Sequence, residues 1–141
     1  MTSIHTAHPT TIEAGRAWDR LVRAGWLFGA GSAVHIVDHL RRGQGSVTEL
    51  LYYAGNSSLV LQVVIVTLVA TRHRAAPVIA VAGGLPLALG FAAAHWLPTW
   101  SALSDSFVSN PTRGFSYLAS ALEIGGAITV AWCGWQVRRT T

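Results

Sequence analysis

One short segment of the chain brings three ionisable side chains onto a single helical turn. His35, Asp38 and His39 are spaced at i, i+3 and i+4. In an α-helix these positions share one face, so we expect the two imidazoles and the carboxylate to point the same way. Imidazole and carboxylate groups bind transition metals, and they also carry out acid–base chemistry. This segment is therefore the first candidate for a functional site.

Two further ionisable residues lie inside apolar stretches later in the chain. His95 lies near the end of the stretch 76–97, and Glu123 lies about 13.5 Å into the stretch 114–137 at ~1.5 Å per residue. Such residues are costly in a membrane and usually face a bundle interior, a cavity or a partner. A lone carboxylate at that depth needs a proton, a cation or a histidine. We therefore expect these residues to gather in the half of the membrane away from the cytoplasm.

The first hypothesis for this group is a metal or haem site. Two histidines one turn apart, joined by a third from a facing helix, form a metal ligand set for zinc, iron or another transition metal. We predict His35, His39 and His95 as the ligands. Asp38 and Glu123 would support them, either by binding directly or by fixing a histidine tautomer. Alternatively, histidines from the first and third helices would ligate a haem axially.

Two other hypotheses stay open at this point. The same Asp, His and Glu residues could form a protonatable pocket that handles a lipid or another small molecule, and such a protein could be an enzyme. Alternatively, the chain is a structural accessory subunit whose polar residues meet a larger membrane complex. The sequence leaves open whether the chain is an enzyme.

Several polar residues also have simple structural roles to play. Residues 46–49 match a helix capping box, which favours Glu49 as a cap rather than a ligand. His39 lies beside Arg41 and could be solvated as readily as bound to a metal. The second helix would present Glu49, Tyr52, Tyr53 and Asn56 on one face. We expect the histidines outside the apolar stretches to be surface residues, namely His5, His8 and His73.

Four apolar stretches must position these side chains. The chain has 141 residues, of which 51% are hydrophobic and 11% charged, against about 25% charged in ordinary soluble domains. The stretches 21–40, 47–70, 76–97 and 114–137 each approach the ~20 residues that cross a ~30 Å hydrocarbon core. Backbone groups in lipid must bond internally, so each stretch is predicted to be helical. We expect an all-α polytopic membrane protein, an antiparallel four-transmembrane-helix bundle over residues 16–141, after a flexible cytoplasmic tail over residues 1–15.

The basic residues predict the orientation of this bundle. All ten are arginine, and they lie in small groups at the ends of the apolar stretches. With both termini in the cytoplasm, seven arginines lie inside and three lie outside, the three being Arg41, Arg42 and Arg113. The positive-inside rule therefore favours a multi-pass protein of the plasma membrane with cytoplasmic N- and C-termini. No basic face with interleaved aromatics is present, so a nucleic-acid partner is not expected.

The sequence lacks the motifs that mark several common classes of soluble enzyme. The chain contains no Gly-rich phosphate loop, nucleophile elbow or CxxC pair. Its single cysteine, Cys133, cannot form an intrachain disulfide and is expected to be a packing residue. The expected partners are membrane lipids, together with either further copies of the chain or a larger membrane complex.

The segments HIVDHLRRGQGSVTELLYYAG, TRHRAAP, GFAAAHWLPTWSALSD and SYLASALEIGG resemble small four-helix integral membrane proteins of actinobacteria. The resemblance extends over most of the chain from the first helix onward. It implies the same number of helices. No activity is known for these proteins, so the resemblance assigns no functional residue.

Overall fold

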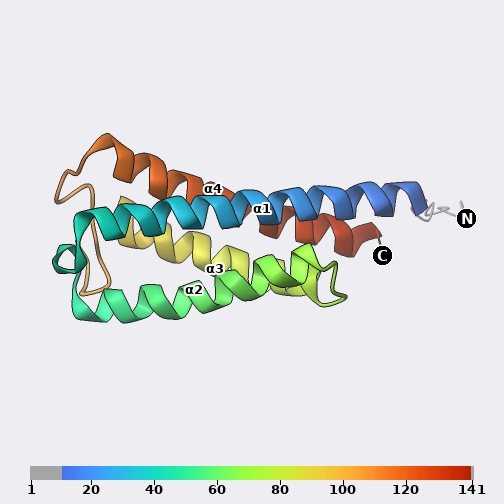
Figure 1. Cartoon of the computed structure of the whole chain (residues 1–141), viewed down its shortest axis with the longest axis horizontal. Helices are drawn as coiled ribbons and strands as arrows, with labels where there is room; N and C mark the ends of the chain where they lie inside the picture. Colours follow the sequence, from blue (N-terminus) through green and yellow to red (C-terminus); the bar gives the residue numbers. More distant parts are fainter. Residues whose placement is uncertain (1–10, 141) are drawn as a thin grey trace, which may run out of the picture.

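The computed structural model describes residues 11–140, and within them the chain is all-α. Four long helices form the bundle shown in Figure 1: α1 (Thr11–Arg42), α2 (Glu49–Ala70), α3 (Ala76–Trp96) and α4 (Gly114–Thr140). A short 3-10 helix, η1 (Gln44–Ser46), connects α1 to α2. Residues 1–10 of the predicted tail, with His5 and His8, lie outside the described residues.

Successive helices run in opposite directions, as predicted for short connections. Figure 1 shows that α1 begins and α4 ends at the same end of the bundle, whereas η1 and the loop 97–113 lie at the other. Helices α1 and α3 both pack closely along α4, and α2 is held more loosely. The residues of α2 that are buried are Gln62, Ile65 and Val69, so its first half stands away from the core.

Three of the described helices, α2, α3 and α4, are long and apolar enough to cross a membrane. Helix α1 does not reach the same hydropathy because ionisable residues occur near both of its ends, from Arg16 to Arg23 and from His35 to Arg42. The prediction of an all-α bundle of four long helices is therefore confirmed, and three of the helices have the length and composition of membrane spans. That α1 is a fourth span stays a prediction.

The helix boundaries differ from the predicted spans mainly at α1. This helix begins at Thr11, so residues 11–15 of the predicted flexible tail are helical. At α2 the predicted capping box is wrong. Thr48 is the N-cap and its side chain accepts a hydrogen bond from the Leu51 N–H at 3.2 Å, while the Ser46 hydroxyl donates to the Gly43 carbonyl. Glu49 occupies the exposed first turn of α2.

Glycines bring α1 and α4 close together at the depth of the candidate site. A Cβ on Gly31 would lie 2.7 Å from the Leu122 carbonyl oxygen, and a Cβ on Gly126 would lie 2.8 Å from the Phe28 Cα. Only glycine permits the two backbones to approach this closely. In lipid no hydrophobic effect drives helices together, so such close packing is what stabilises the contact. The predicted role of small residues is thus confirmed for this helix pair. Gly90 and Gly125, by contrast, have no such neighbour within 4 Å.

The buried polar residues lie toward the end of the bundle that carries η1 and the loop 97–113. They include His35, Asp38, His95, Ser116 and Glu123. The core at the opposite end is apolar and contains Ala17, Leu21, Val69, Ala76 and Val137. The predicted concentration of polar side chains in one half of the bundle is therefore observed.

Candidate metal centre

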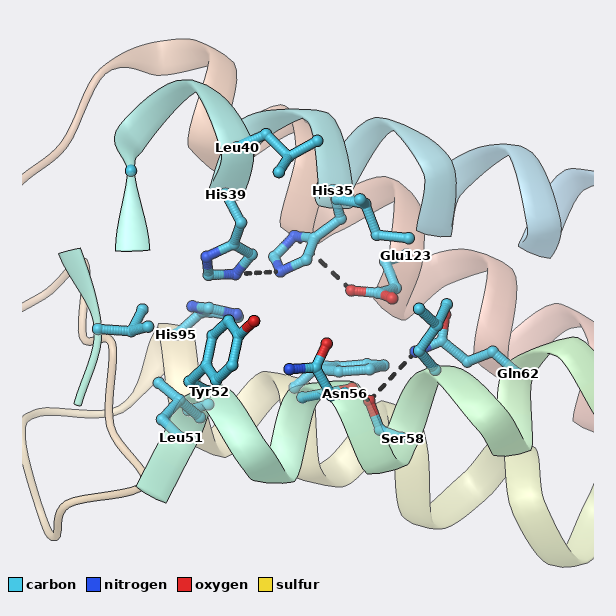
Figure 2. Close-up of a pocket in the computed structure, with 17 residues that line it drawn as sticks. His35, His39, Leu40, Leu51, Tyr52, Asn56, Ser58, Gln62, His95 and Glu123 are labelled. Atoms are coloured by element: carbon cyan, nitrogen blue, oxygen red, sulfur yellow. Dashed lines mark hydrogen bonds and ion pairs between the residues drawn. The ribbon is translucent and has the colours of Figure 1, made fainter. Parts of the chain in front are cut away.

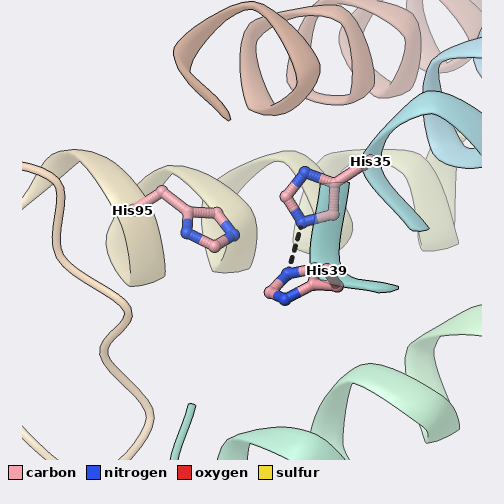
Figure 3. A group of neighbouring side chains, drawn as sticks. All are labelled: His35, His39 and His95. Atoms are coloured by element: carbon pink, nitrogen blue, oxygen red, sulfur yellow. Dashed lines mark hydrogen bonds between the residues drawn. The ribbon is translucent and has the colours of Figure 1, made fainter. Parts of the chain in front are cut away.

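Three imidazoles converge inside the bundle, two from α1 and one from α3 (Figure 3). His35, His39 and His95 each offer a ring nitrogen, and these nitrogens lie within 4.8 Å of one another. His35 Nε2 and His39 Nε2 are 2.9 Å apart, and the ring centroids of His35 and His95 are 4.9 Å apart. The structure thus brings together the three histidines that the sequence singled out.

The spacing of these nitrogens is close to that of a metal site. Zinc binds imidazole nitrogen at ~2.0–2.1 Å, so two nitrogens on one tetrahedral ion lie about 3.4 Å apart. His35 and His95 are buried, at 6% and 2% exposed, and His39 is half-buried. Bringing all three nitrogens to that spacing requires the imidazoles to rotate. The group could therefore hold one metal ion.

A carboxylate faces the ring nitrogen of His35 that points away from the other two histidines. Glu123 Oε2, on α4, lies 3.6 Å from His35 Nδ1, and neither atom has a hydrogen-bond partner although both are buried. This separation is longer than a hydrogen bond but within reach of an ion pair. In metal sites a ligating histidine usually donates its second N–H to a carboxylate, which fixes the ring and its tautomer. Glu123 is placed for that role.

His95 is held in a corresponding way by the loop 97–113. Its Nδ1 lies 3.2 Å from the Asp105 carbonyl oxygen and 3.6 Å from Asp105 Oδ2. The buried Phe107 ring stacks on the imidazole at 4.8 Å between centroids. The loop is tied to α3 because Asp105 N–H donates to the Ala94 carbonyl and Phe107 N–H donates to the His95 carbonyl. This loop therefore fixes the position of the His95 imidazole through its Nδ1 atom and one face of its ring.

Asp105 is a site residue that the sequence reasoning missed. It forms a two-pronged ion pair with Arg42 at 2.5 and 2.7 Å, which joins the end of α1 to the loop. Arg42 lies two residues beyond the predicted first span, and its hydrogen bonds to Asp105 raise the pKa of the guanidinium above its ordinary value. Such bidentate pairs are strong and directional. Asp105 thus fixes His95 relative to the helix that carries the other two histidines.

Asp38 does not join the three histidines, although it shares their helical turn. Its Oδ1 accepts hydrogen bonds from Arg41 Nη2 at 2.7 Å and Nε at 3.2 Å, and Arg41 also donates to Ser116 Oγ on α4. Asp38 is fully buried but does not line the cavity beside the histidines. Asp38 thus holds Arg41 against α4, and its expected support of the metal stays a prediction.

A cavity of about 410 Å³ lies beside the three histidines, between α1 and the loosely packed first half of α2 (Figure 2). Tyr52 and Asn56 from α2 line it, whereas Glu49 and Tyr53 from the same predicted face do not. Its other lining residues include both polar and apolar side chains: Ile36, Leu40, Leu51, Leu59, Gln62, Phe91 and Glu123. No described residue of the loop 98–113 lines it, so the loop supports the site without covering the cavity.

Comparison of the chain with protein-family models, with curated proteins and with solved structures gave no match. The function is therefore inferred from the chemistry of the site. That site consists of three converging imidazoles, two of them backed by carboxylate residues, next to a cavity.

Proposed function

We propose that this chain is a four-span membrane protein that binds one first-row transition-metal ion through His35, His39 and His95. The observation that carries the proposal is the way the two buried histidines are oriented. The Nδ1 atom of each faces a carboxylate residue, Glu123 for His35 and Asp105 for His95. Each imidazole then presents Nε2 as the metal ligand, with its tautomer fixed from behind.

The ligand set favours zinc, copper, iron or nickel over magnesium or calcium. Imidazole suits these borderline metals, whereas magnesium and calcium prefer oxygen ligands. Catalytic zinc sites commonly use three protein ligands and leave a fourth position open. When bound here, such an ion would supply Lewis-acid chemistry to a molecule in the adjacent cavity. The histidines and the two carboxylate residues would hold the ion at the wall of that cavity.

Haem, the other cofactor considered for these histidines, fits less well. Axial ligation by His35 and His95 would require a porphyrin plane between the two rings. Their centroids are only 4.9 Å apart in an edge-to-face contact, and His39 lies against the edge of His35. No porphyrin can enter that space without separating α1 from α3. We therefore propose a single metal ion.

The burial of the site favours a ligand-binding function over an accessory one. An accessory subunit that used these residues to meet a larger complex would display them on its surface. His35, His95 and Glu123 are instead at most 6% exposed. A protein that binds a lipid without metal would use the same cavity. Metal analysis separates the two functions, because such a protein would contain no metal.

We further infer that α1 is the fourth span. Its outward face carries large exposed apolar side chains, which is typical of lipid contact: Trp26, Leu27, Ile36, Val37 and Leu40. The arginine distribution supports cytoplasmic termini in the plasma membrane, with the metal site in the outer half.

Elemental analysis of purified protein tests the metal proposal. Cells supplied with zinc, copper, iron, nickel, cobalt and manganese should yield wild-type protein with about one transition-metal ion per chain. His35→Ala, His39→Ala and His95→Ala should each lose most of it, because each removes one ligand. His73→Ala is the matched control, since His73 lies in the exposed turn between α2 and α3. Equal metal content in all five proteins, or none in any, would overturn the proposal.

A further inference from the structure

The cavity beside the three histidines opens sideways, between two helices. Its exposed lining residues lie along two facing helix edges: Ile36 and Leu40 on α1, and Tyr52 and Asn56 on α2. Phe91 and His95 of α3 and Glu123 of α4 close the opposite side. Leu40 is 75% exposed and apolar, and α2 is apolar enough to cross a membrane. In the proposed four-span arrangement this mouth therefore faces hydrocarbon rather than water.

The cavity is lined by both polar and apolar residues. The polar part of the lining contains the three histidines, Tyr52, Asn56, Ser58, Gln62 and Glu123. Figure 2 shows that the α1 histidines, Glu123 and the α2 side chains point into one space. The apolar part is built from aliphatic and aromatic residues, namely Ile36, Leu40, Val47, Leu51, Leu59 and Phe91. A ligand that fills both parts must be amphiphilic.

Two buried polar atoms at the inner wall have no hydrogen-bond partner among the described residues. They are Glu123 Oε2 and Gln62 Oε1, on side chains that are 2% and 5% exposed. Leaving such atoms without a hydrogen bond in a low-dielectric interior is costly. Both residues line the cavity, so a ligand with a hydrogen-bond donor at its head could satisfy one of them.

We propose that this cavity binds a single-chain lipid alcohol, whose hydroxyl oxygen completes the coordination of the metal ion. This inference rests on the proposed metal site. The hydroxyl can ligate the ion through oxygen while its hydrogen is donated to Glu123. A fatty acid fits less well, because an ionised carboxylate has no hydrogen to donate to Glu123 Oε2. At ~30 Å³ per water-sized unit, the cavity takes roughly a dozen heavy atoms, the size of one medium chain.

The experiment uses the full chain in lipid nanodiscs, loaded with cobalt(II) as a coloured replacement for the natural ion. Cobalt content is measured first, and then 1-dodecanol, dodecanoate or dodecane is added while the visible absorption of cobalt is recorded. We expect a saturable spectral change with 1-dodecanol and none with dodecanoate or dodecane.

Two matched variants locate the binding. Gly55→Trp should fill the cavity, since Gly55 lines it and has no neighbouring atom within 4 Å of a Cβ. It should retain cobalt and weaken the response to 1-dodecanol at least 10-fold. Val60→Trp, on the exposed face of the same helix, should respond like the wild type.

The outcomes separate this inference from the metal proposal. Absence of bound cobalt in the wild type would overturn the metal site, and this inference with it. Bound cobalt that does not respond to 1-dodecanol would overturn the lipid alcohol alone. The same holds for a stronger response to dodecanoate, or a response unchanged in Gly55→Trp.

Discussion

Each buried histidine of the proposed metal site is held through the nitrogen that faces away from the ion. For His35 the facing group is Glu123 Oε2, and for His95 it is the carbonyl and carboxylate of Asp105. If His35 and His95 served packing alone, their other ring nitrogens would have no reason to converge with the imidazole of His39. At the scale of single residues, these two pairings distinguish a metal centre from a chance cluster.

Replacement of Glu123 should weaken metal binding without abolishing it. Glu123→Gln keeps the size of the side chain but removes the carboxyl group that faces His35 Nδ1, so metal affinity should fall roughly 10-fold, within the usual range for such supporting groups. Competition titration with a chromogenic chelator measures this. Glu49→Gln, in the exposed first turn of α2, is the control. A loss as large as in His95→Ala would make Glu123 a direct ligand and contradict the account.

Asp105 should matter to the metal although it lies in a loop. Asp105→Asn weakens the pair with Arg42 and the contact with His95, so we expect a reduction of roughly 10-fold in metal affinity. Asp19→Asn is a matched control, because Asp19 also pairs with an arginine, Arg72, at the other end of the bundle. If the two variants bind metal equally well, the loop does not position His95.

Helical spacing predicted some of these residues and not others. The i, i+4 spacing of His35 and His39 was sufficient to place both on one face, and the depth of His95 and Glu123 in their stretches placed them at the same level. Asp38 also shares that turn, but its side chain pairs with Arg41 instead. Asp105 could not be found by periodicity, because the loop folds back onto α3 through irregular backbone hydrogen bonds.

At the scale of helices, the close contact of α1 with α4 should control the site from a distance. Gly31→Ala would place a methyl group 2.7 Å from the Leu122 carbonyl, next to Glu123. The helices must then separate, at a cost of about 1–3 kcal/mol, and His35 moves away from Glu123. Metal affinity and thermal stability should both fall, as measured by titration and thermal unfolding in detergent.

Gly29→Ala provides the comparison for this change. A Cβ on Gly29 would meet only Val66, at 3.4 Å, which is an ordinary contact. Its metal affinity and unfolding temperature should stay near those of the wild type. If both variants behave alike, the spacing of α1 and α4 does not determine the geometry of the site.

The helices themselves were largely predictable, because long apolar stretches bounded by arginine and short loops leave few alternatives. The looseness of α2 was not predictable. The first half of α2 mixes polar and apolar residues, and Tyr52, Tyr53 and Asn56 are exposed. Nothing in the sequence determines the distance between this half and α1. That spacing creates the cavity. The extension of α1 to Thr11 was also missed, because a hydropathy pattern marks only the apolar part of a helix.

At the scale of the whole molecule, four spans require that the loop 97–113 and the turn between α2 and α3 lie on opposite sides of the membrane. In a Cys133→Ser background, Ala102→Cys should react with an impermeant maleimide added to intact cells. His73→Cys should react only after the membrane is permeabilised. Reaction of both from outside would contradict the four-span arrangement, and the reverse pattern would invert its orientation.

X-ray absorption spectroscopy at the metal edge tests most directly whether the three imidazoles bind one metal ion. Protein reconstituted with one equivalent of zinc should show about three imidazole nitrogens at ~2.0–2.1 Å, with one further oxygen ligand. In His95→Ala the imidazole count should fall to about two. A spectrum dominated by oxygen ligands, or one unchanged in His95→Ala, would contradict the proposed site.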